Sequence, residues 1–140
     1  MNHLFWRNII TDDRQACILR TSYNAFNKFS IDDCNSLIIE EIKDEKVISR
    51  NTIADNIKYY AATLDCEDKI HIIYTNDNIN LKYIIFPQIN IIVNIVSAEQ
   101  NLILRCINIK ILDTNPHIFF TLSDLQFNRH IICHSFLVEG

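Results

Sequence analysis

The chain has 140 residues, a formal net charge of −4 and an apolar fraction of 49%, so we predict a single domain, residues 1–140, that buries one core. Its charges are spread evenly, with 8 basic and 10 acidic side chains in residues 1–65 and 5 and 7 in residues 66–140. Because proteins that bind nucleic acid non-specifically concentrate Lys and Arg on one surface, this spread disfavours that function class.

The first half of the chain is predicted to be helical. Residues 12–28 begin with two aspartates and then place apolar side chains at helical spacing, which indicates a first helix. Ser30 and Asp33 resemble a capping box before a second helix over 31–43, and Asn51 or Ser49 can cap a third helix over 51–64.

The second half is predicted to be β-structure. Residues 69–75 and 79–86 flank Asn76-Asp77-Asn78 and alternate apolar with polar side chains, which is typical of a hairpin. Further strand-like runs follow at 88–96, 102–112, 117–122 and 129–139. The predicted fold class is therefore α+β, with three N-terminal helices followed by an antiparallel sheet of five or six strands.

The stretch 12–86 resembles winged-helix proteins, because the third helix would open with Ser49-Arg50-Asn51-Thr52-Ile53-Ala54 and a hairpin would follow in place of a wing. The resemblance implies that the third helix enters the major groove of DNA. Residues near base edges would then include Asn51, Asn56 and Tyr59, and those near phosphates Arg50 and Lys58. The acidic connector 43–48 and the carboxylates of 65–68 would repel phosphate. The alternative is a packed helix, or a scaffold of this type used for protein contacts.

Glycine is confined to position 140, which excludes several classes of site. Phosphate-binding loops, dinucleotide-binding turns and nucleophile elbows all need internal glycines. The turns must instead use Asn, Asp, Ser and Pro, and Asn tolerates the left-handed region best. The 16 asparagines and 27 isoleucines also indicate an AT-rich coding sequence.

No membrane partner is expected. The N-terminus lacks the pattern of a signal peptide, and the most apolar region, 83–98, is interrupted by Pro87, Gln88, Asn90 and Asn94. Five irregularly spaced cysteines favour reduced thiols, hence a cytoplasmic or nuclear location.

The segment His130-Ile-Ile-Cys133-His134 is the densest group of potential metal ligands. On a strand the two histidines would share one face and Cys133 would lie on the other, so the three could not bind one ion. We therefore expect no metal or cofactor, and keep His130 and His134 only as weak candidates, with Cys106 or His117 as the further ligands. No local signature pairs a cysteine with a histidine, so no catalytic residue or small-molecule substrate is predicted.

These observations predict a non-catalytic intracellular docking or regulatory factor that binds a larger assembly, either a protein complex or a ribonucleoprotein such as the ribosome. The expected contacts are Arg50, Lys58 and Tyr59 toward RNA, and the apolar N-terminal residues Phe5 and Trp6 if they are not buried. Two alternatives stay open: a winged-helix-like nucleic-acid-binding protein, and a small enzyme that depends on Cys or His.

Overall fold

The computed structural model describes residues 16–99 and 101–138, and within them it contains eleven strands in three antiparallel sheets and no helix. The α+β prediction, with its three N-terminal helices, is wrong. The contacts divide the chain into two compact units, residues 1–56 and 57–140. The single domain expected from the chain length stays a prediction.

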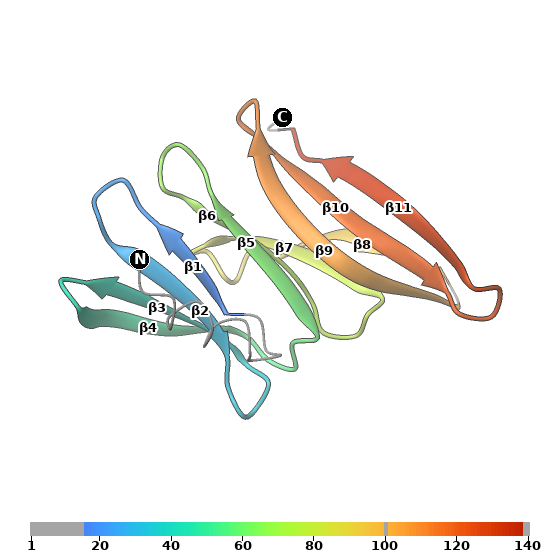
Figure 1. Cartoon of the computed structure of the whole chain (residues 1–140), viewed down its shortest axis with the longest axis horizontal. Helices are drawn as coiled ribbons and strands as arrows, with labels where there is room; N and C mark the ends of the chain where they lie inside the picture. The colour runs from blue at the N-terminus through green and yellow to red at the C-terminus, as the bar shows by residue number, and fades with distance from the viewer. Residues whose placement is uncertain (1–15, 100, 139–140) are drawn as a thin grey trace, which may run out of the picture. The chain divides into compact units, whose positions relative to one another are not determined.

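The first unit contains one four-stranded sheet with the strands in chain order (Figure 1). Its strands are β1 (Cys17–Arg20), β2 (Phe26–Ile31), β3 (Leu37–Lys43) and β4 (Lys46–Ala54). Apolar side chains of the two central strands are fully buried, among them Phe29, Leu37 and Ile39. The edge strand β4 is mostly exposed and has register shifts at two points along β3.

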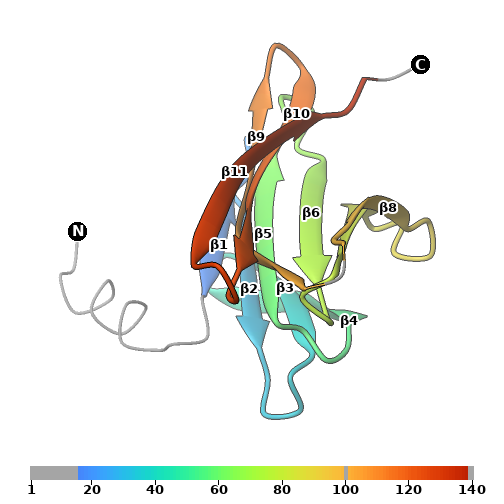
Figure 2. The same ribbon diagram turned by 90° about the vertical axis from the view of Figure 1, so that its right-hand side faces the viewer.

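The second unit contains two sheets. The first sheet has four strands in chain order: β5 (Tyr59–Leu64), β6 (Ile70–Thr75), β7 (Asn80–Phe86) and β8 (Val93–Ser97). The other has three: β9 (Leu102–Leu112), β10 (Asn115–Asp124) and β11 (Arg129–Phe136). Strand β9 lies beside β5, as both ribbon views show (Figures 1 and 2).

One apolar cluster joins the two sheets of the second unit. The sheet β5–β8 contributes Ile73, Leu81 and Tyr83, and the sheet β9–β11 contributes Leu104, Ile109, Ile118 and Phe120. Each of these side chains is buried, because alternate residues of each strand point toward the opposite sheet. The β9–β11 sheet therefore has an inner face in the core and an outer face that this cluster leaves uncovered.

The hairpin turns are built without glycine. Twelve non-glycine residues in the described part of the chain have positive φ, and nine of them are Asn or Asp. Three turns repeat one design, a type I turn followed by a left-handed residue: Asn24 after Thr21, Asn35 after Asp32, and Asp68 after Asp65. The expectation that Asn and Asp would replace glycine in the turns is confirmed.

Side-chain oxygens stabilise these turns. Asp32 Oδ1 accepts hydrogen bonds from the backbone N–H of Cys34 and Ser36, both at 2.9 Å. Asp33, which was predicted to be part of a helix start, thus lies in this same turn, next to Asp32. Asp, Ser and Thr stabilise a helix N-terminus and a hairpin turn by the same local bonds, so the capping-box pattern at Ser30 and Asp33 could not distinguish them.

The predicted helix over 51–64 is instead the end of β4, a bend and β5. Residues 53, 57 and 60 are buried at spacings of four and three residues, which is helical periodicity, so the apolar pattern over this short stretch favoured a helix. Long-range pairing of β3 with β4, and of β5 with β6, decides in favour of strands.

The strand predictions are confirmed for most of the second half. The hairpin over 69–86 is β6 and β7, and the run 102–112 is β9 with the same bounds. The runs 117–122 and 129–139 correspond to β10 and β11. The run 88–96 is a strand only from Val93, because turns occupy the residues that follow Pro87.

The same up-and-down arrangement recurs along the chain. The three sheets begin at Cys17, Tyr59 and Leu102, about every 42 residues, and the third lacks a fourth strand among the described residues. Four-stranded meanders repeated at this spacing are the unit of β-propellers and similar repeat arrays. The sequence analysis found no repeat, because the recurrence is one of topology and turn design.

No helix that could cross a bilayer occurs in the described residues.

We expect Asn78→Gly to stabilise the protein by about 1 kcal/mol. Asn78 has φ 59°, and no described donor reaches its buried Oδ1 atom. Glycine would remove both the strained φ and the unpaired oxygen. The measurement is urea unfolding of the wild type and the variant, with Asn35→Gly as a control that removes only the strained φ (61°). A variant less stable than the wild type would contradict this account of Asn78.

Candidate functional site

A buried histidine in β6 connects a turn carboxylate to a core tyrosine. His71 Nε2 lies 2.9 Å from Asp65 Oδ2, and its Nδ1 lies 2.6 Å from Tyr83 Oη. Because a carboxylate only accepts, Nε2 carries the hydrogen, and in the neutral ring Nδ1 accepts from the tyrosine O–H. His71 and Tyr83 are only 6% and 7% exposed. The sequence analysis did not single out this triad, whose members are separated by 6 and 12 residues.

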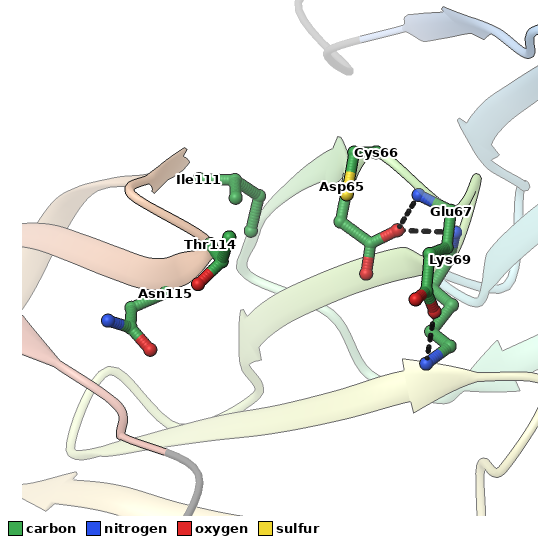
Figure 3. Close-up of a pocket in the computed structure, with 7 residues that line it drawn as sticks. All are labelled: Asp65, Cys66, Glu67, Lys69, Ile111, Thr114 and Asn115. Atoms are coloured by element: carbon green, nitrogen blue, oxygen red, sulfur yellow. Dashed lines mark hydrogen bonds and ion pairs between the residues drawn. The ribbon is translucent and has the colours of Figure 1, made fainter.

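A pocket of about 440 Å³ lies next to this triad, between the β5–β6 and β9–β10 turns. Figure 3 shows its lining: Asp65, Cys66, Glu67, Lys69, Ile111, Thr114 and Asn115. Asp65 Oδ1 accepts from the backbone N–H of Glu67 and Lys69, and the Lys69 ammonium pairs with Glu67 at 2.8 Å. Glu67 and Lys69 are therefore paired with each other, and the Asp65 carboxylate is occupied by backbone N–H groups and by His71.

An Asp–His–hydroxyl chain is the arrangement that activates a nucleophile in hydrolases. Here the hydroxyl belongs to Tyr83, whose side chain is part of the buried core cluster. Neither His71 nor Tyr83 lines the pocket, and both oxygens of Asp65 are occupied by the contacts just described. The triad therefore supports a structural role, which fixes the β5–β6 turn onto β7.

Burial alone would raise the pKa of Asp65, but the hydrogen bonds from His71 and the backbone of Lys69 and Glu67 outweigh it, so the net pKa is lowered. The same balance lowers the pKa of Asp77. Burial opposes the change there too, and hydrogen bonds from Asn80 and Ile79 dominate.

These lowered pKa values predict acid sensitivity. A carboxyl group with a lower pKa in the folded state contributes stability above its unfolded pKa of about 3.9, and this is lost as pH falls through the folded pKa. We expect Asp65→Asn to cost roughly 2 kcal/mol at pH 7 and the difference from the wild type to shrink below about pH 4. Urea unfolding at several pH values measures this.

The control for that experiment is Asp44→Asn, at an exposed turn position where Asn also accepts positive φ. We expect it to be near neutral at every pH. An Asp65→Asn deficit that stays constant from pH 7 to about pH 3 would contradict the role given to the Asp65 charge.

All five cysteines are free thiols, and none of them lies within hydrogen-bonding distance of a described histidine. Cys34, Cys66 and Cys106 are exposed, whereas Cys17 and Cys133 are partly buried. Burial raises the pKa of the Cys17 thiol, which lowers its thiolate fraction at neutral pH.

We therefore expect Cys17 to be modified by a thiol reagent at least about ten times more slowly than the exposed cysteines at pH 7.5. The measurement is a time course with iodoacetamide read by peptide mass spectrometry, and fully unfolded protein is the control. Rapid labelling of Cys17, or one cysteine far faster than the rest, would contradict this and would favour the Cys/His enzyme alternative.

The structure separates the weak metal candidates. His130 and His134 lie four residues apart on one face of β11, a distance of roughly 13 Å, and Cys133 faces the core. His130 Nδ1 contacts Ser123 Oγ at 2.9 Å, while His134 contacts His117. No group of three potential metal ligands occurs in residues 16–99 and 101–138.

The outer face of the β9–β11 sheet carries the most distinctive surface chemistry. By strand register and alternation, its residues are Ile103, Arg105, Asn108, Lys110, His117, Phe119, Thr121, Ser123, His130, Ile132, His134 and Phe136. This set contains two lysine or arginine cations, three histidines and two phenylalanines. It contains no carboxylate, although the whole chain is acidic.

Four rings lie against one another on this face. Phe119 and His134 are stacked with centroids 4.6 Å apart, His117 and His134 meet edge to edge with centroids 5.1 Å apart, and the His117 and Phe136 centroids are 5.6 Å apart. His117 Nδ1 and His134 Nε2 are 2.8 Å apart, which fixes the orientation of the two imidazoles. The result is an ordered aromatic platform, of which Phe136 is 57% exposed.

The cations beside this platform have no described acidic partner. Neither Arg105 nor Lys110 lies within ion-pair distance of a described carboxylate. Acidic groups lie at both ends of the strands: Glu99 and Asp124 accompany His130 in a pocket at one end, and Asp113 lies in the β9–β10 turn at the other. Asp124 is itself paired with Arg129 at 3.4 Å.

Among the described residues, strand β11 pairs only with β10 and is therefore an edge strand. It pairs with β10 over eight residues without a register shift, whereas the edges β4 and β8 are interrupted by such shifts. Its side chains are exposed on both faces, and Ile132 is 84% exposed. An uninterrupted apolar edge is the kind that natural proteins usually cover.

The interaction residues predicted from the sequence do not form a recognition helix. Arg50 and Asn51 lie in β4, where Arg50 pairs with Glu40 at 3.7 Å. Asn56 lies in a bend, Lys58 directly precedes β5, and Tyr59 is the first residue of that strand, in the second unit. Without helices the resemblance to winged-helix proteins fails, so the α+β description and that alternative are both withdrawn.

The predicted contacts Phe5 and Trp6 lie outside the described residues.

Sequence reasoning missed the outer face because its cations and rings come from three strands spread over residues 105–136. The alternation within each strand could have indicated which residues share a face. Only the pairing register places Lys110, His117 and Phe136 in one row.

No family model, curated protein or solved structure matches the chain.

Proposed function

We propose that this protein is a non-catalytic docking factor that attaches to a larger assembly, a protein complex or a ribonucleoprotein, through the outer face of the β9–β11 sheet. The observation that carries the proposal is this face itself, an exposed, ordered group of rings beside unpaired cations. Exposed aromatic side chains and arginine are the residues that contribute most to binding interfaces.

The alternative, that this protein is a small enzyme that depends on Cys or His, receives less support. The Asp65–His71–Tyr83 triad is closed to substrate by burial, and the charged groups of the pocket beside it are already occupied. Five free thiols suit a reducing compartment, so we place the factor in the cytoplasm or nucleus.

Capture of the tagged chain from its native lysate, followed by sedimentation, tests this proposal. We expect the wild type to co-sediment with a large particle, and the double variant Ile132→Asp/Phe136→Asp to recover at least about tenfold less of it. A carboxylate at either position would place an unpaired charge at the centre of the contact.

The matched control is Leu125→Asp/Phe127→Asp, which removes an equally exposed apolar pair from the β10–β11 turn. It is expected to recover the particle like the wild type. Equal recovery by both double variants, or no particle in any sample, would overturn the outer face as the docking surface. Circular dichroism of each variant verifies that the sheets are intact.

A further inference from the structure

We propose that the ligand of the outer face is single-stranded nucleic acid, whose bases stack on the rings of β10 and β11 while its phosphates contact the cations of β9. This inference rests on the proposed function and names the chemistry of its partner. It concerns a surface that neither the composition nor the order of charges along the chain revealed.

Stacking is the first requirement, and the rings are arranged for it. Single-stranded nucleic acid is held without sequence readout by aromatic side chains on a sheet, because every base has a flat π-face. The hydrogen bond between His117 and His134 and the stack of Phe119 on His134 hold the imidazoles in place. At the free end of this group of rings, Phe136 offers an exposed ring to a further base.

Charge is the second requirement. Lys110, His117 and Phe136 are cross-strand neighbours in one row, so the Cα atoms of Lys110 and Phe136 are about 10 Å apart. A strand with one base on Phe136 can therefore place a neighbouring phosphate over Lys110, and Arg105 extends the cationic side further along β9. The outer-face residues include Arg105 and Lys110 and no carboxylate, so their formal charge is positive in an otherwise acidic chain.

An acidic protein segment could form ion pairs with Arg105 and Lys110, but such pairs would not require the ordered rings beside them. A duplex could use the cations as well, but its bases are already stacked and not available to the rings. The combination of stacked rings and unpaired cations therefore favours a single strand over both.

The test is fluorescence anisotropy of the full chain with labelled oligouridylate and oligothymidylate of about 12 nucleotides, and with a duplex of the same length. We expect binding to the single strands, with at least about fivefold weaker binding to the duplex. Phe136→Ala should weaken single-strand binding roughly tenfold. Lys110→Glu should weaken it and reduce the salt dependence by about 0.7 in log–log slope.

Two matched controls distinguish a loss of the proposed site from the loss of any exposed ring or any change in net charge. Phe127→Ala removes an equally exposed ring, 62% against 57%, and Lys46→Glu makes the same charge change on an exposed residue of β4, outside the face. Both are expected to bind like the wild type. If the controls weaken binding as much as the face variants, or if the duplex binds as tightly as the single strands, the stacking site is overturned.

The failure of this inference can be distinguished from the failure of the proposed function. If no oligonucleotide binds at low salt, yet the captured particle still depends on Ile132 and Phe136 and survives nuclease, the face docks on protein and the nucleic-acid inference is overturned. If sedimentation equilibrium shows a dimer that Ile132→Asp/Phe136→Asp abolishes and no oligonucleotide binds, the occupant is a second copy. That outcome also overturns it.

Discussion

The turns that join consecutive strands are the constraint on which the rest of this structure depends. With no internal glycine, the chain reverses direction at Asn and Asp residues of positive φ, stabilised by Asp and Thr side chains that accept nearby backbone N–H groups. Such turns connect antiparallel neighbours only, since parallel strands need long crossovers. Every sheet is therefore an up-and-down meander, and strand order follows chain order.

The meander arrangement also determines where binding chemistry can lie. In the second unit, alternation along β9, β10 and β11 directs one set of residues into the shared core and the other set to the outer face. The core set holds the sheet rigid, so the rings of His117, Phe119, His134 and Phe136 are presented in a defined arrangement. A rigid platform loses little conformational entropy on binding, which makes exposed rings effective contacts.

The predictions from sequence succeeded where turn signals bounded runs with clear alternation, as for 69–86 and 102–112. They failed over the described residues 16–64, where Leu, Ile and Tyr recur at the three- and four-residue spacing of a helix, and where Ser30, Asp33 and Asn51 resembled helix caps. Asp33, which was predicted to start a helix, instead lies in the turn between β2 and β3. Pairing between distant strands overrode these local preferences.

The sequence by itself determined the absence of glycine-dependent sites, the use of Asn and Asp in turns, and the strands of the second half, because these follow from local backbone sterics and short-range periodicity. The tertiary structure alone decided the all-β fold, the buried Asp65–His71–Tyr83 connection and the outer face. Each of these brings together residues from different strands, and the register that aligns them is set by the burial of the opposite face.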